Sequence, residues 1–488
     1  MSQLTRDALE IWRAGVDAVR ADRVMSANCT WDGRWFTVQG VSQDLSLARR
    51  VVVIGAGKAG AGMLAGLLSV LRSSAGSLPQ IVGWVNVPEG SVPSGLVIDG
   101  RVPETEITVL EARPAGVNAP TPLVVKGTQR MLELLSECTP EDVVIFLLSG
   151  GGSALLCAPI QGLDLSTKVR LTSALSLRGA TIQELNAVRR CLSEVKGGGI
   201  SRRCRAGALM TLLISDVLGD PIEMIGSGPT IEEPAPDPEL ALRVLDRFVP
   251  GEFEEVRLLL KSQQPLQVTV GHKSVNRPVF VLANNRTAVD AAAKRAEALG
   301  YHVRTESNVT GEGSVDRFGA LLVSEMISMG SGMGLVSGGE PTVALPVPSI
   351  SFGAVEGGNG GGRGGRNQHL VLTVGWELLR GVKNGEAGEF QKSADVASFV
   401  GEVIRGEREF AVVSGGTDGE DGNTQSAGGW IDHQWVISSV RDPGVVLDTL
   451  NRFDSHTLLG QTGNLLETGP THTNVCDLRV VLTRRCQR

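Results

Sequence analysis

The chain has 488 residues, 42% of them hydrophobic and 20% charged, which is enough to build the buried cores of two or three domains. A net charge of −7 and a single tyrosine exclude nucleic-acid binding that depends on a basic surface or on stacked aromatic side chains. The seven cysteines are odd in number and include no C-x-x-C pair, so a disulfide framework or a zinc site is not expected. Reduced thiols favour a reducing compartment, and we predict a cytoplasmic protein.

The first expected element is an amphipathic helix. Between Met1 and Met25 apolar residues recur at helical spacing among acidic and basic ones. This pattern predicts a helix that packs on a domain, not a signal peptide. The longest uninterrupted aliphatic run, residues 143–148, is too short to cross a bilayer, so no membrane partner is expected.

Further along the chain, short apolar segments alternate with helix-length segments. The predicted strands are residues 51–54, 143–148, 209–214, 279–283, 301–304, 335–336 and 410–413. Their continuous hydrophobicity predicts strands buried on both faces, hence an α/β fold with a mostly parallel sheet covered by helices. Ligands bind at the carboxyl ends of such strands, and here those ends carry clusters of glycine, serine and aspartate.

A polar, proline-flanked segment, residues 261–278, precedes a new strand-helix-strand pattern. We therefore predict two domains, residues 1–265 and 266–488.

The first glycine loop, residues 55–60, reads GAGKAG, follows a predicted strand and opens a helix. Its glycines, Gly55 and Gly57 among them, match the turn that lets an anion approach a helix N-terminus. The dinucleotide-binding form of this motif needs an acidic residue about 20 positions later. The first one here is Glu89, which is too distant. Lys58 places a cation in the loop, which suits a phosphate or a carboxylate; a turn that only packs helix on strand is the alternative.

The second loop directly follows the strand 143–148 and consists of Ser149, Gly150, Gly151, Gly152 and Ser153. Three successive glycines predict a nest of backbone N–H groups that binds an anion.

A helix and its end carry four more candidate contacts, Asn186, Arg189, Lys196 and Gly197. A lysine beside three glycines suits an anion, and a glycine C-cap explains the same pattern equally well.

Two carboxylates, Asp216 and Asp220, follow the strand 209–214. Together they could hold Mg²⁺, which prefers oxygen ligands, and either could accept the proton of an attacking hydroxyl. An aspartate that caps the next turn is the alternative.

The C-terminal half has two more candidate segments. Arg366 ends a glycine-rich stretch and abuts a predicted helix, where a guanidinium can grip a carboxylate or phosphate at two points. Thr417 and Asp418 lie in a third strand-end glycine loop, residues 414–424. That loop lacks the register of a calcium-binding EF-hand, so Mg²⁺ or substrate hydroxyls are the better expectation.

Taken in order, these segments resemble the class II glycerate kinases, also called glycerate 2-kinases, whose C-terminal half is the MOFRL domain. The matching stretches span nearly the whole chain: VVVIGAGKAG (51–60), LLSGGGSALL (147–156), GATIQELNAVRRCLSEVKGGGI (179–200), LLISDVLGDPIEMIGSGPT (212–230), GGRNQHL (364–370), VVSGGTDGEDGNTQSAGGW (412–430) and LLETGPTHTNVCDL (465–478).

The resemblance implies that ATP phosphorylates D-glycerate to 2-phosphoglycerate with Mg²⁺. It implies a larger Rossmann-like N-terminal domain, a smaller α/β MOFRL domain and a site in the cleft between them. The family's lysine in GAGKA falls on Lys58 and its arginine in GGRNQ on Arg366. We expect these two residues and Asp216 to be catalytic, in a monomer or homodimer.

Three features depart from the family pattern. Residues 111–121 lack the H-P-x-P-D-like segment of many members, the lead into GGRNQ (357–362) is long, and His456 and His472 stand where tyrosine and glycine are usual. A rival interpretation is an NAD(P)-dependent hydroxypyruvate reductase, based on GAGKAG and an older family label. Another is a non-catalytic module that binds a sugar phosphate. The carboxylates beside the glycine loops argue against it, because they would repel the phosphate group unless a metal ion lay between them.

Overall fold

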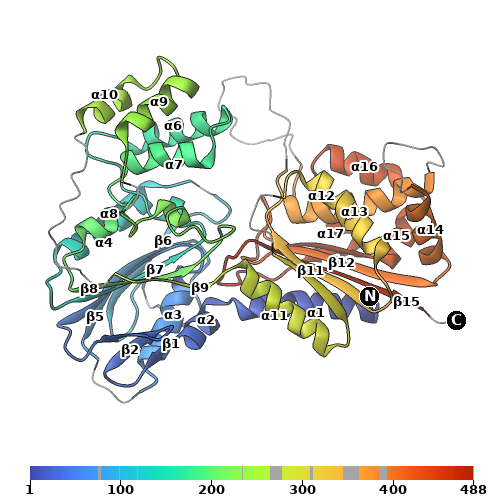
Figure 1. Ribbon diagram of the computed structural model, residues 1–488, viewed down its shortest axis with the longest axis horizontal. Coiled ribbons are helices and arrows are strands. Elements are labelled where there is room, and N and C mark those ends of the chain that lie inside the picture. The colour runs from blue at the N-terminus through green and yellow to red at the C-terminus, as the bar shows by residue number, and fades with distance from the viewer. Residues whose placement is uncertain are drawn as a thin grey trace. The chain divides into compact units, whose positions relative to one another are not determined.

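The computed structural model describes residues 1–74, 78–97, 99–117, 119–232, 235–263, 277–307, 312–343, 362–383 and 393–486. The chain forms two compact units (Figure 1). The larger unit consists of Arg20–Ala283 and His472–Asn474, and the smaller unit of Met1–Val19, Asn284–Thr471 and Val475–Arg488.

The larger unit is built on a six-stranded sheet in the order β6-β5-β4-β7-β8-β9, with every neighbouring pair parallel. Its strands are β4 (Arg50–Ala56), β5 (Gln80–Pro88), β6 (Glu106–Arg113), β7 (Val143–Ser149), β8 (Ala208–Ile214) and β9 (Val279–Ala283). A small antiparallel sheet precedes it, made of β1 (Cys29–Trp31), β2 (Trp35–Val38) and β3 (Val41–Asp44).

Helices cover both faces of the parallel sheet (Figure 1). Val52 and Ile54 of β4 share a core cluster with residues of α4 (Pro122–Ser136), and their neighbours Val51 and Val53 are equally buried. This double coverage is the physical reason for the continuous hydrophobicity of these strands. The other helices of the unit are α2 (Ala21–Asn28), α3 (Gly60–Leu71), α5 (Gly152–Leu155), α6 (Leu165–Leu177), α7 (Ile182–Cys191), α8 (Gly199–Arg203), the 3₁₀ turn η1 (Ile225–Ser227), α9 (Pro238–Phe248) and α10 (Glu254–Ser262).

A second, smaller core lies among four of these helices, α6, α7, α9 and α10. They form a separate helical layer of the unit, labelled together in Figure 1.

The smaller unit holds a mixed six-stranded sheet in the order β10-β11-β15-β12-β13-β14. Only the pair β10–β11 is parallel; the other neighbours are antiparallel. Short apolar runs carry no information about strand direction, so the sequence pattern missed this antiparallel arrangement. The strands are β10 (His302–Ser307), β11 (Met333–Gly339), β12 (Arg408–Gly416), β13 (Gly428–Asp432), β14 (Leu465–Leu466) and β15 (Asp477–Arg485).

Helices α1 (Gln3–Ala18) and α11 (Asn285–Ala298) pack on one face of this sheet, and the remaining helices cover the other face (Figure 1). These are α12 (Val315–Ser328), α13 (Arg366–Lys383), α14 (Ser393–Ile404), α15 (His433–Ser439), α16 (Pro443–Asn451) and α17 (Ser455–Thr462). The two-domain α/β fold expected from the sequence is therefore confirmed.

The predicted domain boundary between residues 265 and 266 lies outside the described residues. Contacts within the chain place the N-terminal helix α1 in the smaller unit. Trp12 of α1 is fully buried there, and its indole N–H donates to the carbonyl of Leu478 at 2.9 Å. The amphipathic pattern predicted one helix between Met1 and Met25; the structure has two, α1 and α2, with a break at Val19 and Arg20. The pattern also does not specify which core the apolar face of α1 will join. Among the described helices, none has both the length and the hydropathy of a membrane span.

Candidate functional site

The first glycine loop leaves the end of β4 and is hydrogen-bonded to the loop after β7. The N–H of Lys58 donates to the carbonyl of Gly150 at 2.8 Å, and the N–H of Ala59 donates to Oγ of Ser149 at 3.0 Å. Gly57 has φ +137°, and a Cβ there would lie 2.7 Å from the carbonyl oxygen of Ser149. Only glycine permits this approach. Two N–H groups of the loop thus join the neighbouring loop, and the anion cradle predicted at this helix start does not include them.

The second glycine loop lies between Lys58 and Asp216. A Cβ at Gly151 would lie 3.3 Å from Cγ of Lys58, and a Cβ at Gly150 would lie 2.7 Å from Cγ of Asp216. Asp216 in turn accepts a hydrogen bond from Nδ2 of Asn474 at 3.2 Å. The structure therefore brings Lys58, the glycine loop and Asp216 together at the carboxyl ends of the adjacent strands β4, β7 and β8, where the sequence placed the site.

Behind the second loop lies a cluster of cations, formed by Lys196, Lys168 and Arg189. Lys196 is 2% exposed, and its Nζ donates to the carbonyl of Gly226 at 3.1 Å and to Oγ of Ser153 at 3.4 Å. Burial, together with the positive charges of Lys168 and Arg189, lowers the pKa of Lys196 to about 7. Burial also lowers the pKa of Lys168 and of Arg189. Sequence reasoning missed Lys168, which occupies a helix that carries none of the glycine motifs.

The glycines after Lys196 do not offer their backbone to an anion. Gly197 and Gly198, with φ of +54° and +80°, donate their N–H groups to the carbonyls of Ser227 and Gly228 at 2.9 and 2.8 Å. The glycine C-cap alternative fails as well, because α7 ends at Cys191. The positive φ lets the chain turn against residues 227–228, so an anion here would be held by side chains such as Lys196 and not by these backbone N–H groups.

Asn186 and Asp220 have local partners. Oδ1 of Asn186 accepts a hydrogen bond from the hydroxyl of Ser227 at 3.0 Å, and Asn186 is buried. Asp220 has φ +53° and lies in the turn after β8, with its N–H donating to the carbonyl of Val217 at 3.1 Å. In the described ranges no group of three or more His, Cys, Asp or Glu side chains could hold a metal ion. Asp216 and Asp220 therefore do not belong to an all-protein metal cage.

In the smaller unit Arg366 begins α13 and is held by two carboxylates. Its Nε and Nη2 donate to the two carboxylate oxygens of Asp477 at 2.6 and 3.0 Å, and Nη1 donates to Glu340 at 2.8 Å. Burial opposes the charge of Arg366, but the adjacent Asp477 and Glu340 raise its pKa above the ordinary value. Arg366, predicted to bind an anionic ligand, thus forms ion pairs with carboxylates of its own unit, although its side chain is one-third exposed.

The third glycine loop carries Thr417, Asp418 and Asp421. The hydroxyl of Thr417 is fully buried, donates to the carbonyl of Cys476 at 2.7 Å and accepts from the N–H of Val475 at 2.8 Å. Asp418 accepts from the N–H of Glu420 at 3.1 Å. Thr417 therefore fixes the loop, and its hydroxyl is not presented to a substrate.

Asp421 caps helix α13 from a distant part of the sequence. It accepts from the N–H groups of Asn367 and Gln368 at 3.1 and 2.8 Å, which satisfies donors at the start of the helix. Burial raises the pKa of Asp421 to about 7, although these backbone hydrogen bonds and Arg366 act in the opposite direction. Asp421 lies 53 and 54 positions from its two partners, so no local sequence pattern links it to this helix.

The two histidines that depart from the family pattern also have defined positions. Nδ1 of His456 lies 3.2 Å from Oε1 of Gln368, and Nδ1 of His472 lies 3.1 Å from the carbonyl oxygen of Ser91. His472 has φ +56°, a conformation that favours glycine, which is the usual residue at this position in the family. The long lead into GGRNQ, residues 357–362, lies outside the described residues except for Gly362.

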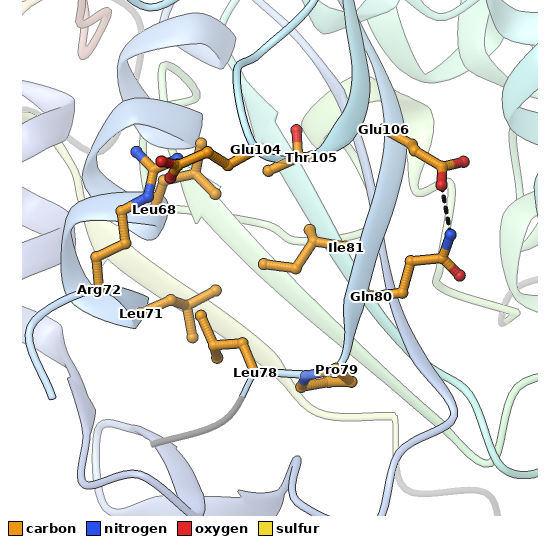
Figure 2. A pocket seen from close by; sticks show the side chains of 10 residues that line it. All are labelled: Leu68, Leu71, Arg72, Leu78, Pro79, Gln80, Ile81, Glu104, Thr105 and Glu106. Carbon is orange, nitrogen blue, oxygen red and sulfur yellow. Dashed lines mark hydrogen bonds and ion pairs between the residues drawn. The ribbon is translucent and has the colours of Figure 1, made fainter. Parts of the chain in front are cut away.

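A separate pocket of about 550 Å³ lies in the larger unit near the starts of β5 and β6 (Figure 2). Arg72 and Glu104 form an ion pair of 3.3 Å in its wall, and Gln80 donates to Glu106. The amino ends of the strands are opposite to the edge that carries the glycine loops, and the lining contains none of the predicted site residues. This pocket therefore does not belong to the candidate site.

Two family patterns match the chain. Residues 7–260 match the family described as "Domain of unknown function (DUF4147)", and residues 333–477 match the MOFRL family. A protein of Danio rerio named glycerate kinase is 32% identical over 99% of this chain and 98% of its own length. The D-glycerate 2-kinase of Thermotoga maritima is 31% identical over 98% of both chains.

A solved structure is similar to this chain in fold as well as in sequence. The crystal structure titled glycerate kinase from Thermotoga maritima has a TM-score of 0.70 and 29% sequence identity, and it covers 98% of this chain and 99% of its own.

Proposed function

The chain belongs to the glycerate kinase family, and on this premise we propose that it transfers the γ-phosphoryl group of ATP to D-glycerate, giving 2-phosphoglycerate. The observation that carries the proposal is the convergence of Lys58, the second glycine loop and Asp216 at adjacent strand ends, beside a group of cations of which two, Lys196 and Lys168, are buried. Phosphoryl transfer needs positioned reactants and neutralised charge more than covalent chemistry, and this arrangement supplies both.

In this proposal the C2 hydroxyl of glycerate attacks the γ-phosphorus, the bond to the bridging oxygen breaks, and ADP leaves. Asp216 accepts the hydroxyl proton, and the ammonium group of Lys58 stabilises the negative charge of the moving phosphoryl group. Lys196 and Ser153 hold the phosphate chain of ATP, with the glycine loops 55–57, 149–152 and Gly197 shaping the backbone around it. The hydrogen bond from Asn474 fixes the carboxylate of Asp216 in place.

Arg366 binds the carboxylate of glycerate in the same proposal. Asp477 and Glu340 use three of the five N–H donors of its guanidinium, and the side chain is one-third exposed. The donors on the exposed edge can therefore take up a ligand without loss of the buried pair. The role of Asp418, and the expected location of the reaction in the cleft between the domains, rest on the family resemblance.

Mg²⁺ is implied by the family, and the residues present fit it. The ion takes one or two carboxylates together with phosphate oxygens and water, so a cage of three protein carboxylates is not required. Asp220, four residues beyond Asp216 in the turn that follows β8, would hold the ion. When bound, Mg²⁺ supplies positive charge that neutralises the β- and γ-phosphates.

A coupled assay with ATP, Mg²⁺ and D-glycerate, in which the product passes to enolase, tests the function. We expect ADP release together with turnover by enolase, which accepts 2-phosphoglycerate. Release of ADP without enolase turnover would place the phosphate on another oxygen. Folded protein that releases no ADP would overturn the kinase and favour reductase chemistry, which a change in nicotinamide absorbance with hydroxypyruvate would detect.

ATP binding is also expected to take up a proton above pH 7. Lys196, with a pKa of about 7, is largely neutral at pH 8 in the empty protein, and Lys168, Arg189 and the thiol of Cys157 are the ionisable groups around it. A bound phosphate favours the charged ammonium, so binding should draw about half a proton or more from the buffer. The uptake should vanish below about pH 6, where Lys196 is already protonated before ATP binds.

Calorimetric titration in two buffers of different ionisation enthalpy measures this uptake. Lys196→Met should remove most of the uptake, and the exposed Lys126→Met should leave it unchanged. Equal heats in both buffers at pH 8 for the unmodified protein would show that Lys196 does not change its protonation on binding.

A further inference from the structure

Lys168 is a buried lysine whose ammonium group has no oxygen or nitrogen partner among the residues that the structure describes. It lies on α6, is 6% exposed, and its Nζ makes no hydrogen bond of ordinary geometry to any residue that the structure describes. The polar group beside it is the thiol of Cys157, a weak hydrogen-bonding partner. An ammonium group in this position loses its hydration without regaining equivalent contacts, which costs stability.

The positive charges near Lys168 further increase the free-energy cost of burying its ammonium group. The charges of Lys168 and Arg189 both act on Lys196, and the charge of Arg189 also acts on Lys168. None of the three forms an ion pair with a carboxylate within the described ranges, whereas the exposed arginine Arg170 on the same helix lies 4.0 Å from Glu255. Buried cations are ordinarily paired, so a cluster of three without a carboxylate indicates that a ligand supplies the negative charge.

We propose that Lys168 is a further phosphate-binding residue, which together with Lys196 and Arg189 holds the phosphate chain of a nucleoside triphosphate. The inference rests on the proposed kinase function and adds to it a residue outside the glycine motifs. Three cations match the several negative charges of a triphosphate better than the single charge of the glycerate carboxylate.

The cluster borders a solvent-exposed residue, Ser153. Ser153, whose Oγ lies 3.4 Å from Nζ of Lys196, is exposed to solvent. It belongs to the same loop as Gly151, which packs against the side chain of Lys58. A phosphate chain that enters past Ser153 therefore has the buried Lys196 and Lys168 and the partly buried Arg189 at one end, and Lys58 toward the other.

The test is the variant Lys168→Met, which keeps the length of the side chain and removes its charge. The matched control is Arg170→Met, which removes an exposed positive charge from the same helix. We expect Lys168→Met to weaken binding of ATP and of inorganic tripolyphosphate about 10- to 100-fold, as for the loss of one charge-assisted hydrogen bond. The KM for D-glycerate should change less than about two-fold, and Arg170→Met should leave both values unchanged.

A second readout separates ligand binding from a structural role. Because methionine removes an unpaired buried charge, the melting temperature of the empty Lys168→Met protein should stay the same or rise, while the stabilisation by added ATP should shrink. A fall in the melting temperature with unchanged affinity for ATP and tripolyphosphate would overturn the proposal and make the contact with Cys157 structural.

Other results would also decide between ligands. A raised KM for D-glycerate with unchanged affinity for ATP would overturn the phosphate assignment and give the cluster to the substrate carboxylate. Unmodified protein that binds ATP but does not phosphorylate glycerate would overturn the proposed function alone, and the effect of Lys168→Met on ATP binding would still stand.

Discussion

The variant Lys58→Met is expected to lower kcat about 10²- to 10³-fold, as when one group that stabilises transition-state charge is lost, while the protein stays folded. The backbone N–H of Lys58 donates to the carbonyl of Gly150, and the aliphatic part of its side chain packs on Gly151. Methionine keeps both contacts and removes only the ammonium group. Binding of ATP should weaken much less than kcat falls, because in our proposal the charge of Lys58 acts mainly on the moving phosphoryl group.

Steady-state kinetics with ATP and D-glycerate, together with thermal melting, provide the measurement. Lys126→Met, on the exposed side of α4, is the matched control and should behave as the unmodified protein does. Near-normal turnover by Lys58→Met would remove Lys58 from the chemistry. A large drop in the melting temperature would indicate instead that the ammonium group supports the packing of the two glycine loops.

The second large effect concerns stability. Arg479→Met is expected to lower the free energy of unfolding by about 3–5 kcal/mol, because it removes the guanidinium that pairs with the buried carboxylate of Glu312. Arg479 is 1% exposed, and Nη1 and Nη2 donate to the two carboxylate oxygens of Glu312 at 2.8 and 2.6 Å. Its Nε also donates to Oγ of Ser337 at 3.2 Å, and the guanidinium carbon lies 4.4 Å from the ring centre of Phe318.

Denaturant unfolding, followed for each variant, measures this effect. The exposed pair Arg286–Asp290 in the same unit is the control, and Arg286→Met should change the free energy of unfolding by less than about 1 kcal/mol. Replacing both partners, with Arg479→Met and Glu312→Gln, should recover part of the loss because the buried negative charge is removed together with the positive one. An Arg479→Met protein as stable as the unmodified one would contradict the role assigned to this ion pair.

The location of the candidate site could be predicted from the sequence, for a physical reason. Strands such as β4 and β7 are buried on both faces, so their hydrophobic runs are continuous and their ends are sharply marked by the glycine loops. Because the strands are parallel and adjacent, the residues that follow them lie at one edge of the sheet. The sequence predicted that Lys58, the second loop and Asp216 each follow a strand, and the structure adds that these strands, β4, β7 and β8, are neighbours.

What depends on contacts between distant segments could not be predicted. Asn474 reaches Asp216 across 258 positions of sequence, and Asp477 reaches Arg366 across 111. Lys168 is a lone lysine in a helical pattern, and such a residue is usually exposed. Its burial beside Lys196 follows from how the helical layer packs, which the sequence periodicity of a single helix does not reveal.

The glycines after Lys196 show a second limit of prediction from sequence, which concerns hydrogen-bond partners of the backbone. Glycine marks a backbone that needs positive φ, but the pattern does not say which partner the turned backbone will meet. At Gly197 and Gly198 that partner is the chain itself, at Ser227 and Gly228.

The division of the chain has a consequence for its biosynthesis. The larger unit needs His472–Asn474 and the smaller unit needs the helix α1, so neither is one continuous stretch of chain. A ribosome translating the chain releases the residues of β9 long before Asn474, the partner of Asp216. The larger unit therefore cannot complete its site during synthesis of its own strands, and both units finish folding only when nearly the whole chain has been made. For the same reason, a single cut in the gene cannot yield either unit whole.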